Sequence, residues 1–160
     1  MDGNLDMLVE NGWLFKNDEN QLLHYFSDIV KKYPNSARAK FELGNVYDYL
    51  GQEMKAIPLP LYEEALEMGL KDEWEAYALI QLGSSLKNVG KLNDALEVLT
   101  EAETRFPHLL SISMFLGITL HHANRESEGM KTVLKAVMRQ MKTTDIERYS
   151  FALDNYINKL

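Results

Sequence analysis

One short stretch of the sequence carries side chains that could bind a metal ion. His121 and His122 are followed by Glu126 and Glu128. Residues four apart on a helix lie on the same side, whereas adjacent residues point about 100° apart. Only His122 and Glu126 have the first spacing, and two ligands are fewer than the three that a protein supplies to catalytic zinc. We therefore expect no metal site, and a metal-dependent regulator or hydrolase built on His121, His122 and Glu126 stays as an alternative.

Sequence strings that mark common active sites do not occur in this chain. There is no GxxxxGK[ST] or GxGxxG for phosphate groups, no GxSxG for a nucleophilic serine and no HExxH for zinc. The chain also has no Cys, which excludes disulfides, thiolate catalysis and Cys-based zinc sites together. These absences predict a protein that is not an enzyme and that needs no cofactor.

The composition fits a compact domain. Of the 160 residues, 46% are hydrophobic and 26% are charged, which is enough apolar surface to build a core. A net charge of −7 disfavours binding to nucleic acid or to an anionic membrane. The N-terminal residues are acidic where a secretory signal is positive, and no stretch approaches the roughly 18 apolar residues of a membrane span. We expect a cytoplasmic protein with no nucleic-acid or membrane partner.

A repeat of 34 to 39 residues organises the chain. Pairs of Leu and Gly recur with their glycines 39 and then 34 residues apart, at Leu43-Gly44, Leu82-Gly83 and Leu116-Gly117. Turn-forming residues repeat both intervals, at Gly51, Gly90 and Asn124. Such a period is typical of solenoids, in which each unit packs on its neighbours.

Each unit is predicted to be two amphipathic helices joined by a tight turn. Leu79, Leu82 and Leu86 have the spacing that places apolar side chains on one helix face. Gly83 has no Cβ and would let a neighbouring helix approach closely. The turn glycines would end the first helix in the left-handed conformation, for which asparagine is the next best residue. Pro107 would end the second helix of its unit, because proline has no backbone N–H.

The period divides a single domain, 1–160, into four units and a C-terminal helix. The boundaries are a degenerate repeat at 3–36, a repeat with a five-residue insertion at 37–75, repeats at 76–109 and 110–143, and a capping helix at 144–160. The last segment opens with Thr144, Asp145, Ile146 and Glu147, the pattern of a capping box. Solenoid ends need such a cap.

Eight residues at fixed spacing match the tetratricopeptide repeat: Leu82, Gly83, Leu86, Gly90, Ala95, Leu99, Ala102 and Pro107. The stretches FELGNVYDYLGQEMKAIPL and ALIQLGSSLKNVGKLNDALEVL look like a family of small bacterial tetratricopeptide proteins, and the resemblance covers about residues 36–143. It implies an all-α fold, a right-handed α-α superhelix of about three and a half to four helix pairs with a concave face. It also implies a role in protein–protein contact, and some family members are thought to dimerise.

The resemblance implies that the first helix of each unit lines the concave surface with the same five positions. In this chain those positions are Arg38, Phe41, Asn45, Asp48, Tyr49, Tyr77, Ile80, Ser84, Lys87, Asn88, Ser111, Met114, Ile118, His121 and His122. Aromatic and methionine side chains among amide and charged groups are typical of a peptide-binding lining. Alternatively, the C-terminal helix folds into the groove and covers Met114, Ile118 and Tyr77, because an exposed apolar patch needs a cover.

The unit at 37–75 is longer than its neighbours, and two of its extra residues fall within the stretch IPLPL. Pro58 and Pro60 both lack a backbone donor. We therefore expect the second helix of this unit to start late, or to carry a kink or bulge, near residues 57–61. The other three residues lengthen the loop around Gly69 to Glu73.

Charge is distributed unevenly along the chain. The net charge is −3 for 1–36, −5 for 37–75, −1 for 76–109, +3 for 110–143 and −1 for 144–160. An acidic cluster comprises Glu63, Glu64, Glu67, Asp72, Glu73 and Glu75, and a basic stripe comprises Lys131, Lys135 and Arg139. We favour two solvated outer faces, because exposed ion pairs contribute little. The alternative is that the stripe meets the acidic cluster of another copy or steers an acidic partner.

The sequence therefore predicts a non-enzymatic adaptor that binds an unknown protein or peptide segment along the concave groove, or that forms a homodimer. Phe41, Tyr49, Tyr77 and Met114 would be the apolar anchors, and Arg38, Asn45, Lys87 and Asn88 would bind the backbone and charged ends of the ligand. A structural homodimer whose groove is filled by its own C-terminal helix is the alternative.

Overall fold

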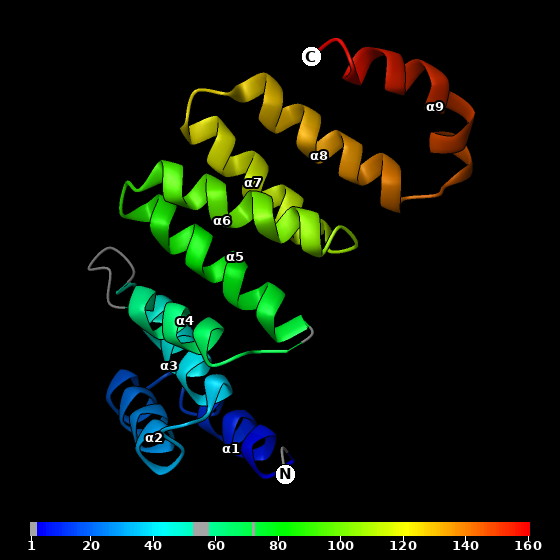
Figure 1. Ribbon diagram of the computed structural model, residues 1–160. Coiled ribbons are helices and arrows are strands. Elements are labelled where there is room, and N and C mark those ends of the chain that lie inside the picture. The colour runs from blue at the N-terminus through cyan, green and yellow to red at the C-terminus, as the bar shows by residue number, and fades with distance from the viewer. Residues whose placement is uncertain (1–2, 53–57, 72) are drawn as a thin grey trace. The chain divides into compact units, whose positions relative to one another are not determined.

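The computed structural model describes residues 3–52, 58–71 and 73–160, and these residues form helices joined by turns, with no strand among them. The helices follow one another along the chain as drawn in Figure 1. They are α1 (Gly3–Trp13), α2 (Glu19–Lys32), α3 (Ala37–Tyr49), α4 (Pro58–Glu67), α5 (Glu73–Asn88), α6 (Leu92–Arg105), α7 (Leu110–His122), α8 (Glu126–Gln140) and α9 (Thr144–Ile157).

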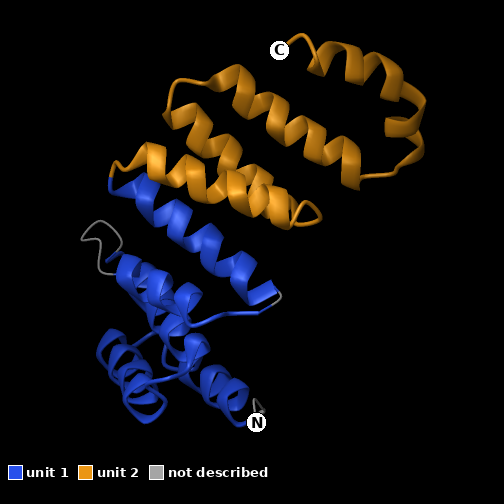
Figure 2. Cartoon of the chain, in the orientation of Figure 1, with its two compact units in different colours: residues 1–89 blue, residues 90–160 orange. Residues whose placement is uncertain are grey.

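The chain divides into two compact units, Met1–Val89 and Gly90–Leu160. Unit 1 contains α1 to α5 and unit 2 contains α6 to α9, as coloured in Figure 2. The boundary falls at the turn after α5, so it separates the two helices that the sequence groups into one repeat at 76–109.

Three inter-helix turns adopt the left-handed conformation that the sequence predicts. Gly51 and Gly90 have φ angles of 67° and 82°, and Asn124 has a φ of 57°. Each stands two residues after the last residue of α3, α5 or α7. Among the described residues, Asn124 is the one non-glycine residue with a positive φ. The predicted helix ends are therefore confirmed at these three positions.

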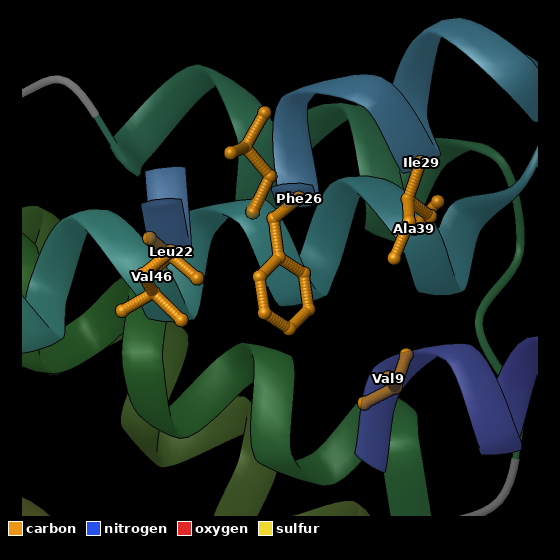
Figure 3. Close-up of a cluster of buried hydrophobic side chains, with 7 residues drawn as sticks. Val9, Leu22, Phe26, Ile29, Ala39 and Val46 are labelled. Carbon is orange, nitrogen blue, oxygen red and sulfur yellow. The ribbon is translucent and has the colours of Figure 1, made fainter. Parts of the chain in front are cut away.

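A hydrophobic core joins the first three helices of unit 1. Its buried members are Val9 from α1, Leu22, Phe26 and Ile29 from α2, and Ala39, Leu43 and Val46 from α3 (Figure 3). The α2 members are spaced so that they share one helix face. Asp18 and Ser36 fix the starts of α2 and α3, because each side chain accepts a hydrogen bond from a backbone N–H of the first turn.

The helix α4 packs against both α3 and α5. The ring of Tyr62 lies so close to α3 that a Cβ added at Gly44 would stand 2.6 Å from its Cε1. The glycine of the first Leu-Gly pair thus permits a close helix approach. Pro60 lies in the first turn of α4, where its missing N–H would have no helical partner. The irregularity is predicted near residues 57–61. The described helix begins at Pro58, and residue 57 lies outside the described residues.

The helices α7 and α8 make the closest approach in unit 2. A Cβ added at Gly117 would stand 2.5 Å from Val133 Cγ2, and one added at Gly129 would stand 2.7 Å from the carbonyl oxygen of Gly117. The helix α6 ends at Arg105, two residues before Pro107, and this confirms the predicted helix end.

The C-terminal helix α9 packs along α8 and has one fully buried apolar residue, Ile157. Its N-cap is Thr143, whose side chain makes no cap hydrogen bond, and Thr144 is already helical. The predicted capping box at Thr144 is therefore wrong. Hydrogen bonds from the Thr143 side chain and from backbone N–H groups of the first turn instead lower the pKa of the Asp145 carboxyl.

Candidate protein-binding surfaces

The predicted lining residues of α3 and α5 lie in unit 1, where these two helices contact each other. Phe41 and Ile80 are buried, with 3% and 6% of their surface exposed, so they build the interior of the unit. The remaining eight are half-buried or exposed and form what we name the α3–α5 surface: Arg38, Asn45, Asp48, Tyr49, Tyr77, Ser84, Lys87 and Asn88.

Aromatic rings stand at one part of the α3–α5 surface. The Arg38 guanidinium lies 3.1 Å from the ring centroid of Trp74, which meets the ring of Tyr77 edge-on at 5.7 Å. Trp74 also meets the ring of Phe41 at 6.0 Å, and it is 40% exposed, so part of its side chain can contact a ligand. The Tyr77 hydroxyl donates to the Glu73 carboxylate at 3.0 Å, and this bond raises the pKa of Tyr77. Sequence reasoning missed Trp74, whose one signal is its spacing of three residues from Tyr77.

Arg38 is held in place by a buried carboxylate. Glu42 is 3% exposed, and its Oε1 accepts hydrogen bonds from Nε and Nη2 of Arg38, each at 2.7 Å. Its Oε2 lies 3.4 Å from donors of Trp13 and Asn45. These hydrogen bonds offset the free-energy cost of removing the two charged groups from water. Arg38 therefore orients Trp74 and satisfies Glu42, which leaves less of its bonding capacity for a ligand than the sequence predicts.

A row of hydrogen bonds links α3 to α4 and α5. The Asn45 side-chain oxygen accepts from Gln81 Nε2 at 3.2 Å, and the Asp48 carboxylate accepts from the Tyr62 hydroxyl at 2.5 Å and from the Ser85 hydroxyl at 3.3 Å. Buried or half-buried polar groups that are bonded in this way are held in fixed orientations. The α3–α5 surface therefore has polar side chains in fixed orientations as well as aromatic rings.

The predicted lining residues of α7 lie in unit 2. Met114, Ile118 and His121 line an open pocket of about 440 Å³ together with residues of α8, and we name it the α7–α8 pocket. Its other lining residues are Gly117, Glu126, Gly129, Met130 and Val133. Ser111 and His122, also predicted, are exposed and do not line this pocket.

The C-terminal helix does not cover these α7 residues within unit 2. It packs along α8, and Met114 and Ile118 each remain 49% exposed. The alternative in which the chain's own tail covers Met114 and Ile118 is therefore wrong for this structure. Ile157 is the one buried side chain of α9, and its burial stabilises the packing of α9 on α8.

The histidine and glutamate residues do not converge on a metal site. The helix α7 ends at His122 and α8 begins at Glu126, so a turn separates two residues that a continuous helix would have placed on one side. His121 lines the α7–α8 pocket with Glu126 instead. Within residues 3–52, 58–71 and 73–160, no three His, Cys, Asp or Glu side chains are grouped so as to hold a metal ion.

Members of both predicted charge clusters have partners inside their own unit. Glu64 forms an ion pair with Lys40 in unit 1. Lys131 donates to the carbonyl oxygen of Asn158 at 3.2 Å, and Arg139 pairs with Glu103 at 3.0 Å in unit 2. Asp72 lies outside the described residues. These local pairs favour the prediction of two solvated faces.

No helix in the described part of the chain has both the length and the apolar character needed to cross a membrane.

The family of the chain follows from its sequence match and its helix pairs. The family model described as tetratrico peptide repeat matches residues 37–160. The chain belongs to the tetratricopeptide repeat family. The predicted fold class and family resemblance are thereby confirmed, and the fold supports a role as a protein–protein interaction scaffold. No curated protein is similar enough in sequence to count as a relative.

Solved structures with the same fold include two tetratricopeptide proteins. MamA of Desulfovibrio magneticus RS-1, residues 41 to the end, is 20% identical with a TM-score of 0.68, over 81% of this chain and 72% of that one. YrrB, described as a TPR protein with an unusual peptide-binding site, is 21% identical with a TM-score of 0.67, over 92% of this chain and 70% of that one. The TM-scores show that these proteins share a fold with this chain, and at sequence identities this low the comparison shows the fold alone.

Proposed function

We propose that this tetratricopeptide protein is a non-enzymatic scaffold whose α3–α5 surface binds a peptide segment of a partner protein. The observation that carries the proposal is the hydrogen-bonded polar row of Asn45, Gln81 and Asp48, on a unit that also exposes two aromatic side chains. These are Trp74 and Tyr49, and the ring of Tyr49 meets that of Trp13 edge-on at 5.7 Å. Fixed polar groups can bind a peptide backbone, and exposed aromatic rings are the side chains that anchor most protein interfaces. The peptide-binding site that is described for YrrB supports the same use of this fold.

The charge of unit 1 favours a ligand with basic residues. Residues 1–89 contain fifteen acidic and eight basic residues, so they carry the whole net charge of −7. A field of one sign attracts segments of the other sign and raises their rate of association. Aromatic anchoring would suit an apolar residue of the same segment, so the proposed ligand is a basic peptide with at least one large apolar side chain.

The experiment selects peptides from a displayed random library against the wild-type chain and measures their affinity by fluorescence polarisation. Replacing Tyr49 and Trp74 together by Ala removes both exposed anchors, and we expect Kd to rise at least about tenfold, because an anchor residue typically contributes more than 1 kcal/mol. Phe151→Ala is the control, since Phe151 is an exposed aromatic residue of unit 2, at 83%, that lines neither the α7–α8 pocket nor the pocket between α8 and α9.

Two outcomes would remove this proposal. One is an unchanged Kd in the double variant. The other is a loss of affinity that accompanies a large fall in melting temperature, which would mean that Tyr49 and Trp74 stabilise unit 1 rather than bind a ligand.

A homodimer is the second candidate function, and a different observation favours it. Unit 2 exposes the large apolar side chains of Met114, Ile118 and Met130 on one pocket. Patches of this kind mark interaction surfaces on soluble proteins. Sedimentation of the wild-type chain tests for a species of twice the 18.4 kDa of one chain.

A further inference from the structure

Several exposed apolar residues of unit 2 line two adjoining pockets, which are formed by three helices. The α7–α8 pocket adjoins a second pocket of about 340 Å³ between α8 and α9, and Met130 lines both. The second pocket, which we name the α8–α9 pocket, is lined by apolar and tyrosine side chains alone: Met130, Leu134, Val137, Met138, Ile146, Leu153, Tyr156, Ile157 and Leu160. Methionine side chains are flexible and adapt to a partner, so this surface can accept a bulky apolar ridge.

The helix α9 uses only part of its apolar face on α8. At 100° per residue, Ile146, Leu153 and Ile157 fall on one side of the helix, and Ile157 is buried there. Tyr149 and Tyr156 follow on the adjoining side of the helix and remain 57% and 71% exposed. Leu160, which follows the end of α9 and lines the α8–α9 pocket together with Tyr156, is 48% exposed. Unit 2 therefore carries these three exposed side chains on and just after α9, which we name the ridge, as well as the largely apolar α7–α8 pocket.

We propose that unit 2 binds unit 2 of a second copy, with the exposed ridge of each α9 against the α7–α8 pocket of the other copy. This inference rests on the homodimer proposed above and assigns its interface. A ridge and a groove on the same unit allow a twofold arrangement, in which each contact is made twice and the assembly closes. The ridge of α9 does not bind the α7–α8 pocket of its own chain in this structure, because α9 packs on α8 through the buried Ile157.

Charge supports a second copy as the occupant. Residues 90–160 contain nine acidic and nine basic residues, so unit 2 is neutral, whereas unit 1 carries −7. Two neutral units can approach without the repulsion that two copies of unit 1 would experience, and proteins of zero net charge associate more readily.

The exposed area is sufficient for a small specific interface. Six residues of the α7–α8 pocket and the ridge are 48% to 71% exposed: Met114, Ile118, Met130, Tyr149, Tyr156 and Leu160. If large side chains offer about 150–200 Å² each, covering these six would bury on the order of 500 Å² per copy. Both copies together then bury about 1,000 Å², which is the size at which specific interfaces begin.

The experiment measures dimer dissociation by sedimentation velocity over a concentration series of the full chain. Met130→Lys places a charge where the two pockets meet, and we expect it to raise the dimer Kd at least tenfold. Met7→Lys is the matched control, because Met7 lies on α1 of unit 1 and is 59% exposed, against 55% for Met130. It should leave the dimer Kd unchanged.

A second pair of variants tests which face of α9 is used. Tyr156→Glu lies on the proposed ridge and should weaken the dimer as strongly as Met130→Lys. Phe151→Glu should have no effect, because Phe151 is 83% exposed and lies on the opposite side of α9. Mixing the Met130→Lys and Tyr156→Glu chains should restore a heterodimer, since one wild-type ridge then meets one wild-type pocket and the two new charges pair.

The outcomes separate this inference from the proposed functions. A monomeric wild-type chain at high concentration would overturn the interface and the homodimer together, while peptide binding at unit 1 is measured independently. A stable dimer that Met130→Lys and Tyr156→Glu leave intact would keep the homodimer and overturn this interface. Circular dichroism of each variant must match that of the wild type, and the heterodimer rescue then confirms that the weakened variants are folded.

Discussion

At the scale of single residues, the buried carboxylate of Glu42 organises the aromatic part of the α3–α5 surface. A carboxylate that is 3% exposed keeps its charge only if donors replace the water it has lost. Arg38 supplies two of these donors and lays its guanidinium plane on Trp74. A lysine could carry the charge, but it has neither the planar stack nor two fixed donors. Arg38 thus links the buried carboxylate to the exposed ring of Trp74, which also contacts the rings of Phe41 and Tyr77.

We expect Arg38→Met to lower the free energy of unfolding by about 3 kcal/mol, because it leaves the Glu42 charge buried without its main partner. Urea unfolding followed by circular dichroism measures this change. The double variant Arg38→Met with Glu42→Gln removes the charge as well, and it should recover a large part of the loss. Equal losses in the single and double variants would show that the stacking on Trp74, rather than the ion pair, supplies the stability.

At the scale of helices, α7 and α8 can lie close together because glycines, Gly117 and Gly129, stand at two facing positions. The carbonyl oxygen of Gly117 would stand 2.7 Å from a Cβ at Gly129, and backbone atoms cannot move aside as the end of a flexible side chain can. This close approach also shapes the α7–α8 pocket, since both glycines line it. The same two glycines therefore determine how α7 packs on α8 and how the pocket is shaped.

Gly129→Ala should accordingly destabilise unit 2 by about 1–3 kcal/mol, the usual range for an overpacked core. The gain in helix propensity from Gly to Ala works in the opposite direction and is worth about 1 kcal/mol at most. Thermal unfolding of the variant gives the net effect. Ser127→Ala, on the exposed surface of the same helix, is the control and should change stability little. A stabilised Gly129→Ala chain would mean that α7 and α8 can separate at no cost.

Local signals in the sequence predicted the helix ends, because a left-handed turn requires Gly or Asn whatever surrounds it. They failed where a prediction depended on how residues of different helices lie relative to one another. The i, i+4 pairing of His122 with Glu126 assumed a continuous helix, and the turn at Asn124 separates the two residues. The apolar face of α9 was visible in its spacing, but the sequence does not tell which part of that face α8 covers. Burial of Phe41 and Ile80 likewise depends on neighbouring helices rather than on their repeat positions.

At the scale of the whole molecule, the two units differ in the kind of contact that they favour. Unit 1 carries the entire net charge of −7 and offers polar groups beside aromatic rings, whereas unit 2 has no net charge and exposes several large apolar side chains around its two pockets. Contacts between charges weaken as salt screens them, and the burial of apolar surface does not. Ionic strength therefore distinguishes the two proposed activities within one chain.

Raising the salt concentration from low to moderate should weaken binding of a basic peptide to unit 1 several-fold, because the screening length falls to about 8 Å at physiological ionic strength. Over the same range, the dimer Kd should change by less than about twofold, because most of the side chains in the proposed interface are apolar and Glu126 is the one acidic residue of the α7–α8 pocket lining. Fluorescence polarisation and sedimentation on one protein sample give both values. A dimer that dissociates as salt rises would instead support contact between the basic stripe of Lys131, Lys135 and Arg139 and the acidic cluster of a second copy. That result would move the interface away from α9, since its ridge of Tyr149, Tyr156 and Leu160 carries no charge.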